Sequence, residues 1–503
     1  MRSIVAVAAA IALLAVASTS TATAQTALLG DLPATGIALV TSTGGSTTAL
    51  IEGAATEGCS VRSMWITVSG RFVGFSPGRP EFVNAAWLRE VPGDVPAGMP
   101  LLVVCGADAP PPSTSASPRA DGLPNALRIG MADAPGGASA RAAEEFAYRY
   151  QYLAGGVNTG NGWANWNPDG SFVSNYIEES EDVGIIPVFT YYMMRQSAPG
   201  ASMGESEGNL ANVADSATMR AYFEDLRLFF QRATGADTPV ILHVEPDLWG
   251  YLQQRSSGND ASTVDVRVAS SGVPELAGLP DTLAGFAQAI VRLRDRYAPD
   301  VLLGYHVSVW GTGTDIALAD PSNAEVDRLA GSAASFYQSL DAGFDLVFGE
   351  FSDRDAAFKE AQYGDGGASW WDAGDFARFA RFLDGIVDEV DLPAVLWQIP
   401  LGNTTMRAMN NSWNHYQDNR VEWLLDDPSG AHLRAYRDAG VIALLFGRGA
   451  DGATCACDAA QDGRTDPPAI NGNTRASVSA DDDGGYFKER VREYEQNGAL
   501  SLE

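Results

Sequence analysis

The chain has 503 residues, and its 63 acidic residues against 33 Lys and Arg give a net charge of −30. This length allows more than one domain, with one of them large. The charge argues against nucleic acid as a partner, because an acidic surface repels phosphate backbones. The other interpretation of the charge is that it only keeps the protein soluble.

The first predicted segment is a targeting signal. Met1 and Arg2 precede an apolar run from Ile4 to Ala17, and the small residues Ala22-Thr23-Ala24 stand before Gln25. This pattern predicts a secretory signal peptide, residues 1–24, that is cleaved near Ala24 to give a secreted, extracellular protein. An uncleaved anchor is the alternative, but the run is too short to span a bilayer and no later stretch reaches about 18 apolar residues. No membrane partner is expected.

Residues 25–107 predict a small all-β domain. Short runs in which apolar and polar residues alternate cover 64–68, 72–75 and 101–105, and Ser76-Pro77-Gly78 supplies turn residues. The stretch GFSPGRPEFVNAAWL resembles a small module found in exported bacterial proteins. We expect this domain to be a spacer or a weak binder of a surface or glycan.

Four cysteines in an exported chain favour two disulfides. Cys59 with Cys105 would tie the N-terminal domain, and Cys455 would then pair with Cys457 in a tight, strained ring. The alternative, a zinc site, lacks the spacing of a zinc ribbon.

A linker and a large second domain follow. Residues 108–122 are rich in Pro and Ser and predict a linker. From residue 123 to 503, apolar strand candidates alternate with segments of helical period, as in a (β/α)8 TIM barrel of the α/β class. The strand candidates are 127–131, 150–153, 185–190, 240–244, 301–307, 345–348, 394–397 and 441–446. Helices are predicted over 217–233, 280–297, 375–390 and 430–439.

The main alternative to a barrel is an open, doubly wound sheet. No G-x-G-x-x-G follows the first strand of the domain, so a dinucleotide site is unsupported. The tail from Ala450 onward is predicted to be a loop-like cap on the barrel that closes with a short helix over 486–495. An Asp-rich run at 481–483 could hold calcium, although a solvated acidic segment is favoured.

Carboxylates follow two of the predicted strands. The fourth strand runs directly into Glu245-Pro246-Asp247, and the sixth ends at Glu350. Barrel enzymes carry their catalytic groups at the C-terminal strand ends. Glycoside hydrolysis needs two carboxyl groups, one that protonates the leaving oxygen and one that attacks the sugar or activates water. We expect Glu245 to be the general acid, with Asp247 as the close rival. Glu350 is the first choice for the nucleophile or base, and Asp353 is the second.

Each of these carboxylates also has a structural interpretation. Glu245 could be a satisfied buried carboxylate, and Asp247 could cap the helix after the fourth strand. The sequence leaves both alternatives open, and it gives no separation between the carboxyl groups. The choice between retaining and inverting chemistry depends on this separation.

The predicted loops after the strands are rich in aromatic and amide side chains. Sugars stack on aromatic faces through their C–H surfaces, so this composition favours a glycan site. The expected substrate-binding residues are Trp163, Trp166, Tyr191, Tyr192, Trp249, His306, Trp310, Trp397, Gln398, Asn403 and Trp413.

The segment after the fourth strand resembles two glycosidase patterns. In clan A barrel glycosidases a Glu-Pro at this place carries the acid/base, which implies Glu245; the chain has Val244 where clan A has Asn, and Gln398 where clan A has its second Glu. In family 6 cellulases an I-E-P-D segment carries the proton donor on its Asp, which implies Asp247; the other aspartate motifs of that family are missing. Together these resemblances indicate an outlying group of barrel glycoside hydrolases.

The sequence therefore predicts a secreted glycoside hydrolase, endo-acting on a glucan or related polysaccharide. The alternative is a non-catalytic carbohydrate-binding barrel, which Gln398 at the end of the seventh strand keeps open. An esterase ranks last because no nucleophile elbow is present. No cofactor and no metal are implied, and a monomer is expected.

Overall fold

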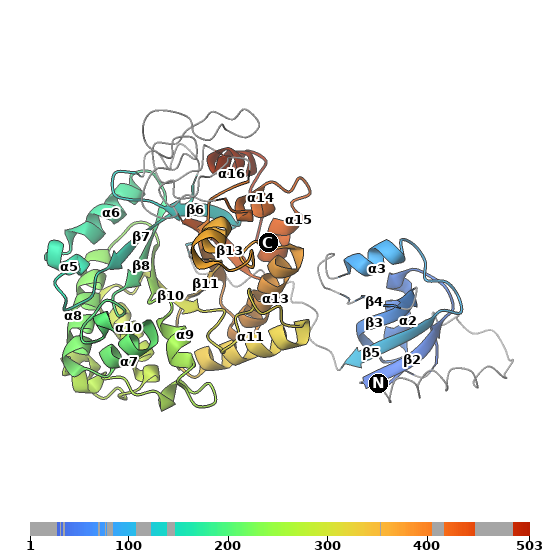
Figure 1. Cartoon of the computed structure of the whole chain (residues 1–503), viewed down its shortest axis with the longest axis horizontal. Helices are drawn as coiled ribbons and strands as arrows, with labels where there is room; N and C mark the ends of the chain where they lie inside the picture. The colour runs from blue at the N-terminus through green and yellow to red at the C-terminus, as the bar shows by residue number, and fades with distance from the viewer. Residues whose placement is uncertain are drawn as a thin grey trace. The chain divides into compact units, whose positions relative to one another are not determined.

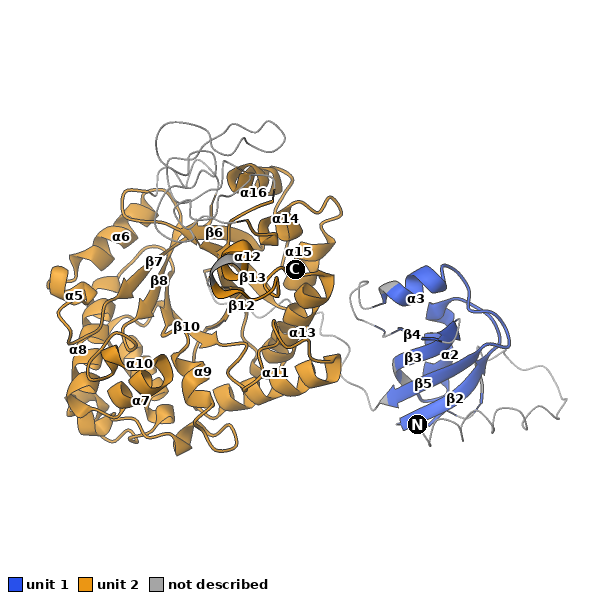
Figure 2. Ribbon diagram, viewed as in Figure 1, with its two compact units in different colours: residues 1–115 blue, residues 116–503 orange. Residues whose placement is uncertain are grey.

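The computed structural model describes residues 28–30, 32–33, 36–68, 71–75, 77, 84–106, 122–137, 146–352, 354–404, 417–447 and 486–502. The chain divides into two compact units, residues 1–115 and 116–503, which are coloured separately in Figure 2. The predicted signal peptide, Asp353, Cys455, Cys457, the Asp-rich run and Trp413 lie outside the described residues. Among the described residues, no helix combines the length and apolar character needed to cross a bilayer.

The first unit is built on an antiparallel sheet with the strand order β1-β2-β5-β3-β4. Its strands are β1 (Leu28–Leu29), β2 (Gly36–Ser42), β3 (Ser60–Val68), β4 (Arg71–Phe75) and β5 (Pro100–Gly106). The sheet confirms the predicted N-terminal β domain. Two helices that the sequence analysis did not predict accompany it, α2 (Thr47–Thr56) and α3 (Ala85–Glu90).

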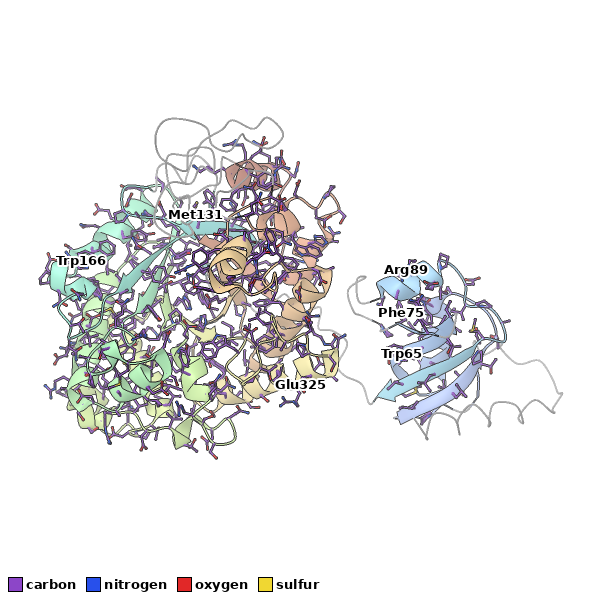
Figure 3. The ribbon with its side chains drawn as sticks, in the orientation of Figure 1. Trp65, Phe75, Arg89, Met131, Trp166 and Glu325 are labelled. Carbon is purple, nitrogen blue, oxygen red and sulfur yellow. A yellow bond between two sulfur atoms is a disulfide. The ribbon has the colours of Figure 1, made fainter. Side chains whose placement is uncertain are left out.

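One face of this sheet packs against the helices. Leu50 of α2 and Trp87 of α3 are fully buried with Val40 and Val103 of the sheet, whereas Trp65 of β3 lies on the surface (Figure 3). The predicted disulfide between Cys59 and Cys105 is present and joins the start of β3 to the end of β5.

The second unit contains a closed barrel of eight parallel strands, which confirms the predicted (β/α)8 fold (Figure 1). Every expected strand is present. The strands are β6 (Arg128–Ala132), β7 (Tyr148–Ala154), β8 (Ile186–Tyr192), β9 (Val240–Val244), β10 (Val301–Val307), β11 (Leu346–Glu350), β12 (Ala394–Pro400) and β13 (Val441–Gly447). Strands β9 and β13 are buried along their whole length, as a parallel strand covered on both faces must be.

Helices surround the barrel (Figure 1). They are α5 (Trp163–Trp166), α6 (Ser171–Glu181), α7 (Glu205–Val213), α8 (Ser216–Ala233), α9 (Leu248–Gln253), α10 (Leu283–Tyr297), α11 (Asn323–Gln338), α12 (Ala356–Phe358), α13 (Ala373–Val390), α14 (Arg420–Leu425), α15 (Ala431–Asp438) and α16 (Tyr486–Gln496). Short helical turns are η1 (Gly200–Ser202), η2 (Ala261–Thr263), η3 (Ala269–Ser271), η4 (Pro274–Leu276) and η5 (Lys359–Tyr363).

The long helices begin where a side chain can cap them. Asp215 accepts a hydrogen bond from the Thr218 amide at the start of α8, and Thr282 accepts one from Gly285 at the start of α10. Each helix then buries one apolar face, in α8 through residues such as Phe223. The five predicted helices of this unit correspond to α8, α10, α13, α15 and α16.

Candidate active site

The turn after β9 has an unusual backbone. Glu245 and Asp247, on either side of Pro246, have φ angles of 45° and 67°, which non-glycine residues seldom adopt. The Glu245 amide still donates to the Tyr191 carbonyl at 2.8 Å and so continues the strand pairing. Such strained positions cost about 1–3 kcal/mol each and cluster at functional sites. The turn makes the side chains of Glu245 and Asp247 point into different surroundings.

The carboxyl group of Glu245 is fully enclosed by protein. Its oxygens accept hydrogen bonds from the backbone amides of Met193 and Met194 at 3.1–3.2 Å, just after β8. Burial raises the pKa of Glu245 to about 8, although the two amides and the Tyr222 hydroxyl act in the opposite direction. This carboxyl group therefore holds the β8 loop against the β9 turn and has no surface open to a large substrate.

Asp247 lies in a different environment. It precedes α9 but makes no side-chain cap with that helix, and its side chain is only partly buried. One of its carboxylate oxygens, one carboxylate oxygen of Glu350 and one ring nitrogen of His306 all lie within 4.8 Å of one another. These three residues come from the C-terminal ends of β9, β10 and β11, which are consecutive strands of the barrel. We call them the mouth cluster.

A pair of buried histidines supports the mouth cluster from inside the barrel. His306 Nδ1 lies 3.0 Å from His243 Nε2, and His243 Nδ1 lies 3.4 Å from the Thr190 hydroxyl. Burial lowers the pKa of His306 to about 3 and that of His243 well below its usual range, so both rings are neutral at neutral pH. Since Nδ1 of His306 is hydrogen-bonded to His243, Nε2 is the ring nitrogen that has no hydrogen-bond partner among the described residues.

Aromatic side chains adjoin the mouth cluster. Burial raises the pKa of Tyr152 well above its usual range, and the nearby Tyr150, Glu350 and Asp247 add to the effect. The Trp397 ring packs against Tyr152 with ring centroids 5.9 Å apart. Trp397 in β12 is also the strand-pairing partner of Glu350 in β11. Tyr152 was not predicted from the sequence, although the spacing of Tyr148, Tyr150 and Tyr152 along one strand was a signal, because alternate residues share a face.

A second aromatic pair stands beyond Asp247. The rings of Tyr251 in α9 and Trp310, which follows β10, have centroids 4.6 Å apart, and both are partly exposed. Gly250 allows the loop after β10 to pack this closely against α9, because it has no side chain. A Cβ added to Gly250 would lie 2.7 Å from Ser308 and 3.0 Å from the Trp310 ring. Burial raises the pKa of Tyr251 to about 12, and the nearby Glu205 and Asp247 add to this effect. Tyr251 was not predicted from the sequence.

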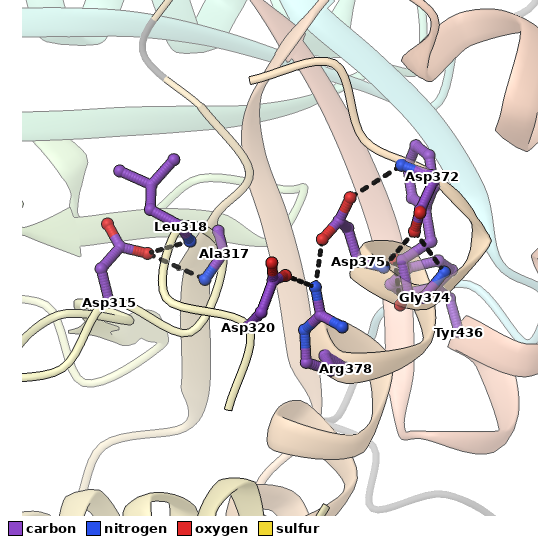
Figure 4. A network of polar contacts seen from close by, with 10 residues as sticks. Asp315, Ala317, Leu318, Asp320, Asp372, Gly374, Asp375, Arg378 and Tyr436 are labelled. Atoms are coloured by element: carbon purple, nitrogen blue, oxygen red, sulfur yellow. Dashed lines mark hydrogen bonds and ion pairs between the residues drawn. The ribbon is translucent and has the colours of Figure 1, made fainter. Parts of the chain in front are cut away.

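The loop that carries Trp310 is attached to the start of α13, as Figure 4 shows. Arg378 forms ion pairs with Asp320, at the end of this loop, and with Asp375, in the first turn of α13. Asp372 caps the same helix by accepting from the Gly374 amide at 2.7 Å. The loop after β10 is therefore connected to the neighbouring helix layer.

The remaining predicted site residues lie in varied surroundings. Tyr192 is partly exposed, donates to Glu205 at 2.8 Å, and has its pKa raised by burial and then by Asp247, so it also adjoins the mouth cluster. Gln398 is partly buried, with a φ of 55° at an irregularity between β12 and β13. Trp166 is exposed in α5, at the outer edge of the barrel unit (Figure 3).

Besides His306 of the mouth cluster, four further predicted binding residues have no accessible surface in the structure. Trp163, Tyr191, Trp249 and Asn403 are 0% exposed. Trp163 Nε1 and the Tyr191 hydroxyl both donate to Asp225, at 2.7 and 2.6 Å, and Trp249 Nε1 donates to the Val244 carbonyl at 2.9 Å. The sequence shows aromatic residues after the strands but not that these side chains turn toward the helix layer.

No protein-family model and no curated protein sequence matches the chain. Among solved structures, it is similar to the modular endo-β-1,4-mannanase of Cellulomonas fimi, of glycoside hydrolase family 26, with 11% identity and a TM-score of 0.38 over 64% of this chain and 65% of that one. The chain thus spans less than two thirds of that mannanase.

Two further solved structures are similar. The catalytic domain of a family 26 endo-β-1,4-mannanase from Bacillus sp. JAMB-750 has 13% identity and a TM-score of 0.41, over 75% of this chain and 88% of that one. A β-glucosidase from Thermotoga maritima has 13% identity and a TM-score of 0.41, over 76% and 100%. Similarity at this level carries no functional conclusion, so the function has to be inferred from the site residues.

Proposed function

We propose that this chain is a secreted glycoside hydrolase that cleaves a polysaccharide by double displacement, with Asp247 as the acid/base and Glu350 as the nucleophile. The observation that carries the proposal is the approach of the Asp247 and Glu350 carboxylate oxygens to within 4.8 Å at the C-terminal ends of barrel strands. Two carboxyl groups at an aromatic-lined barrel mouth are what glycoside hydrolysis requires.

The short approach supports retention of configuration at the sugar. Retaining glycosidases hold their carboxyl groups about 5–5.5 Å apart, whereas inverting enzymes leave about 6.5–9.5 Å for a water molecule. In the first step Asp247 gives its proton to the glycosidic oxygen while Glu350 attacks the anomeric carbon and the leaving sugar departs. In the second step Asp247 takes a proton from water, which attacks the same carbon and releases Glu350.

Asp247 replaces Glu245 as the preferred acid because of what surrounds each carboxyl group. Glu245 is enclosed and bound by the amides of Met193 and Met194, so a sugar would have to displace the loop after β8 to reach it. Asp247 is partly accessible beside Glu350. Glu245 then acts as a positioning residue that fixes the turn on which Asp247 stands.

The surroundings of the mouth cluster support a neutral glycan as the substrate. Tyr192 and the Tyr251–Trp310 pair adjoin Asp247 and keep accessible surface against which sugar C–H faces can stack. The net charge of −30 disfavours anionic polymers but not uncharged ones. An endo-acting enzyme for a glucan or a related polysaccharide fits these features.

The test is the release of reducing ends from β- and α-glucans, mannans, xylans and arabinans by the purified chain and by Glu350→Gln. Hydrolysis of one polymer that the variant loses supports the proposal, and the length of the first products separates endo from exo action. Binding to a polymer without any hydrolysis would instead favour a non-catalytic carbohydrate-binding barrel.

A further inference from the structure

The mouth cluster combines two features of a metal site. Its two carboxylates and one imidazole bring three ligand atoms within 4.8 Å of one another. The His306 side chain is 0% exposed, and its Nε2 has no hydrogen-bond partner among the described residues. A buried polar atom without a partner is destabilising, so this nitrogen is available to act as a ligand to a bound ion.

We propose that Asp247, His306 and Glu350 bind one divalent transition-metal ion of the zinc type. A neutral imidazole nitrogen with two carboxylates suits such ions, whereas Mg²⁺ and Ca²⁺ prefer oxygen ligands alone. The partial exposure of Asp247 and Glu350 leaves one side of the site open to water or an added ligand. The ion would also offset the repulsion between the two carboxylates.

The histidine pair fits this role. A metal-binding histidine usually donates its other ring N–H to a second group, which fixes its tautomer and orientation. Here His306 Nδ1 lies 3.0 Å from His243 Nε2, and His243 Nδ1 can in turn donate to the Thr190 hydroxyl at 3.4 Å. With this tautomer, Nε2 of His306 keeps its lone pair available for an ion. Loss of such an outer partner typically weakens metal binding 10–100-fold.

Metal binding has a consequence for activity that rests on the proposed function. A carboxylate that coordinates a cation can neither carry the catalytic proton nor attack a sugar. The ion and glycan hydrolysis therefore use the same two carboxylates in mutually exclusive ways. Zinc should inhibit the hydrolase, and removal of zinc with a chelator should restore its activity.

Binding is tested on chelator-treated protein by calorimetric titration with Zn²⁺, in an excess of Mg²⁺ that occupies the acidic surface. We expect one Zn²⁺ per chain, with affinity reduced at least tenfold in His306→Gln and unchanged in His432→Gln, a control on α15. Cobalt supplies a second readout, because its visible absorption should show a nitrogen ligand that His306→Gln removes. Denaturant unfolding of each variant confirms that it is folded.

The outcomes separate the metal site from the proposed hydrolase. No specific zinc binding, or binding that His306→Gln leaves intact, overturns the metal site even if glycan hydrolysis is found. Zinc binding that depends on His306, without hydrolysis by either the zinc-loaded or the chelated protein, supports the metal site and overturns the proposed hydrolase. Hydrolysis that is unaffected by bound zinc overturns the competition between them.

Discussion

Glu245 and Asp247 are separated by one proline, yet the Glu245 carboxyl group is fully enclosed while Asp247 is partly accessible beside Glu350. The positive φ angles at both residues cause this difference, because they turn successive side chains away from the alternation of a strand. The two acids of the same short motif therefore have different roles in the proposed enzyme.

Substitution of each acid by its amide separates these roles. Asp247→Asn should reduce glycan hydrolysis by about 10²–10⁴-fold, the usual contribution of a positioned acid/base. Glu245→Gln should keep most of the activity, because the amide oxygen can still accept from Met193 and Met194. Initial rates of reducing-end release on the best polymer measure both effects. If Glu245→Gln shows the larger loss, the acid is Glu245, as the sequence alone suggested.

The fold could be predicted from the sequence to a large extent. Each barrel strand is a short apolar run, such as Val240–Val244 and Val441–Gly447, that is followed by polar residues and then by a segment of helical period. The helices of the first unit were harder to predict. For example, α2 (Thr47–Thr56) is short and rich in small residues and Thr, which do not give a clear apolar stripe.

The site could be predicted only as a set of residues. Asp247, His306 and Glu350 all follow from their places at strand ends. Their grouping could not be predicted, because it depends on the backbone at Glu245 and Asp247 and on the order of β9, β10 and β11 in a closed barrel. The same holds for Trp163 and Tyr191, whose polar atoms bind the buried Asp225.

The stereochemistry of hydrolysis tests the separation of the carboxylates. NMR spectra taken early in the reaction should show that the first product keeps the anomeric configuration of the cleaved bond. In Glu350→Ala, added azide should restore turnover and give a glycosyl azide of the opposite configuration, because azide occupies the position of the lost nucleophile. Inversion by the wild type would exclude a covalent intermediate on Glu350.

Substitution of an exposed aromatic residue should weaken substrate binding, whereas substitution of a buried one should reduce the stability of the fold. Trp310→Ala should raise KM several-fold with little change in unfolding, because a partly exposed ring that stacks on sugar contributes roughly 0.5–1.5 kcal/mol. Tyr191→Phe removes the 2.6 Å hydrogen bond to Asp225 and should lower the free energy of unfolding by about 1–3 kcal/mol, with KM unchanged. Michaelis kinetics and urea unfolding measure the two effects. A higher KM in folded Tyr191→Phe would contradict this division.

Glu245 should make the folded state less stable as pH rises. Its pKa is about 8 in the folded protein and close to 4.5 in an unfolded chain, so between these values the folded state binds more protons. The contribution of Glu245 to the free energy of unfolding is then fully present below about pH 4.5. It is lost as pH rises toward about 8, at a limit of about 1.4 kcal/mol per pH unit for one group. Asp225, whose pKa is raised by burial to about 6, acts in the same direction over the lower part of this range.

Urea unfolding at intervals between pH 5 and pH 8 measures this dependence, with Glu245→Gln as the matched variant. The wild type should require less urea as pH rises, whereas the variant, which has no proton to lose at this position, should show a shallower slope. The two curves should therefore diverge most near pH 8, where the wild-type carboxyl group becomes charged inside the protein. Parallel curves would mean that Glu245 is ionised throughout, with its charge held by the amides of Met193 and Met194.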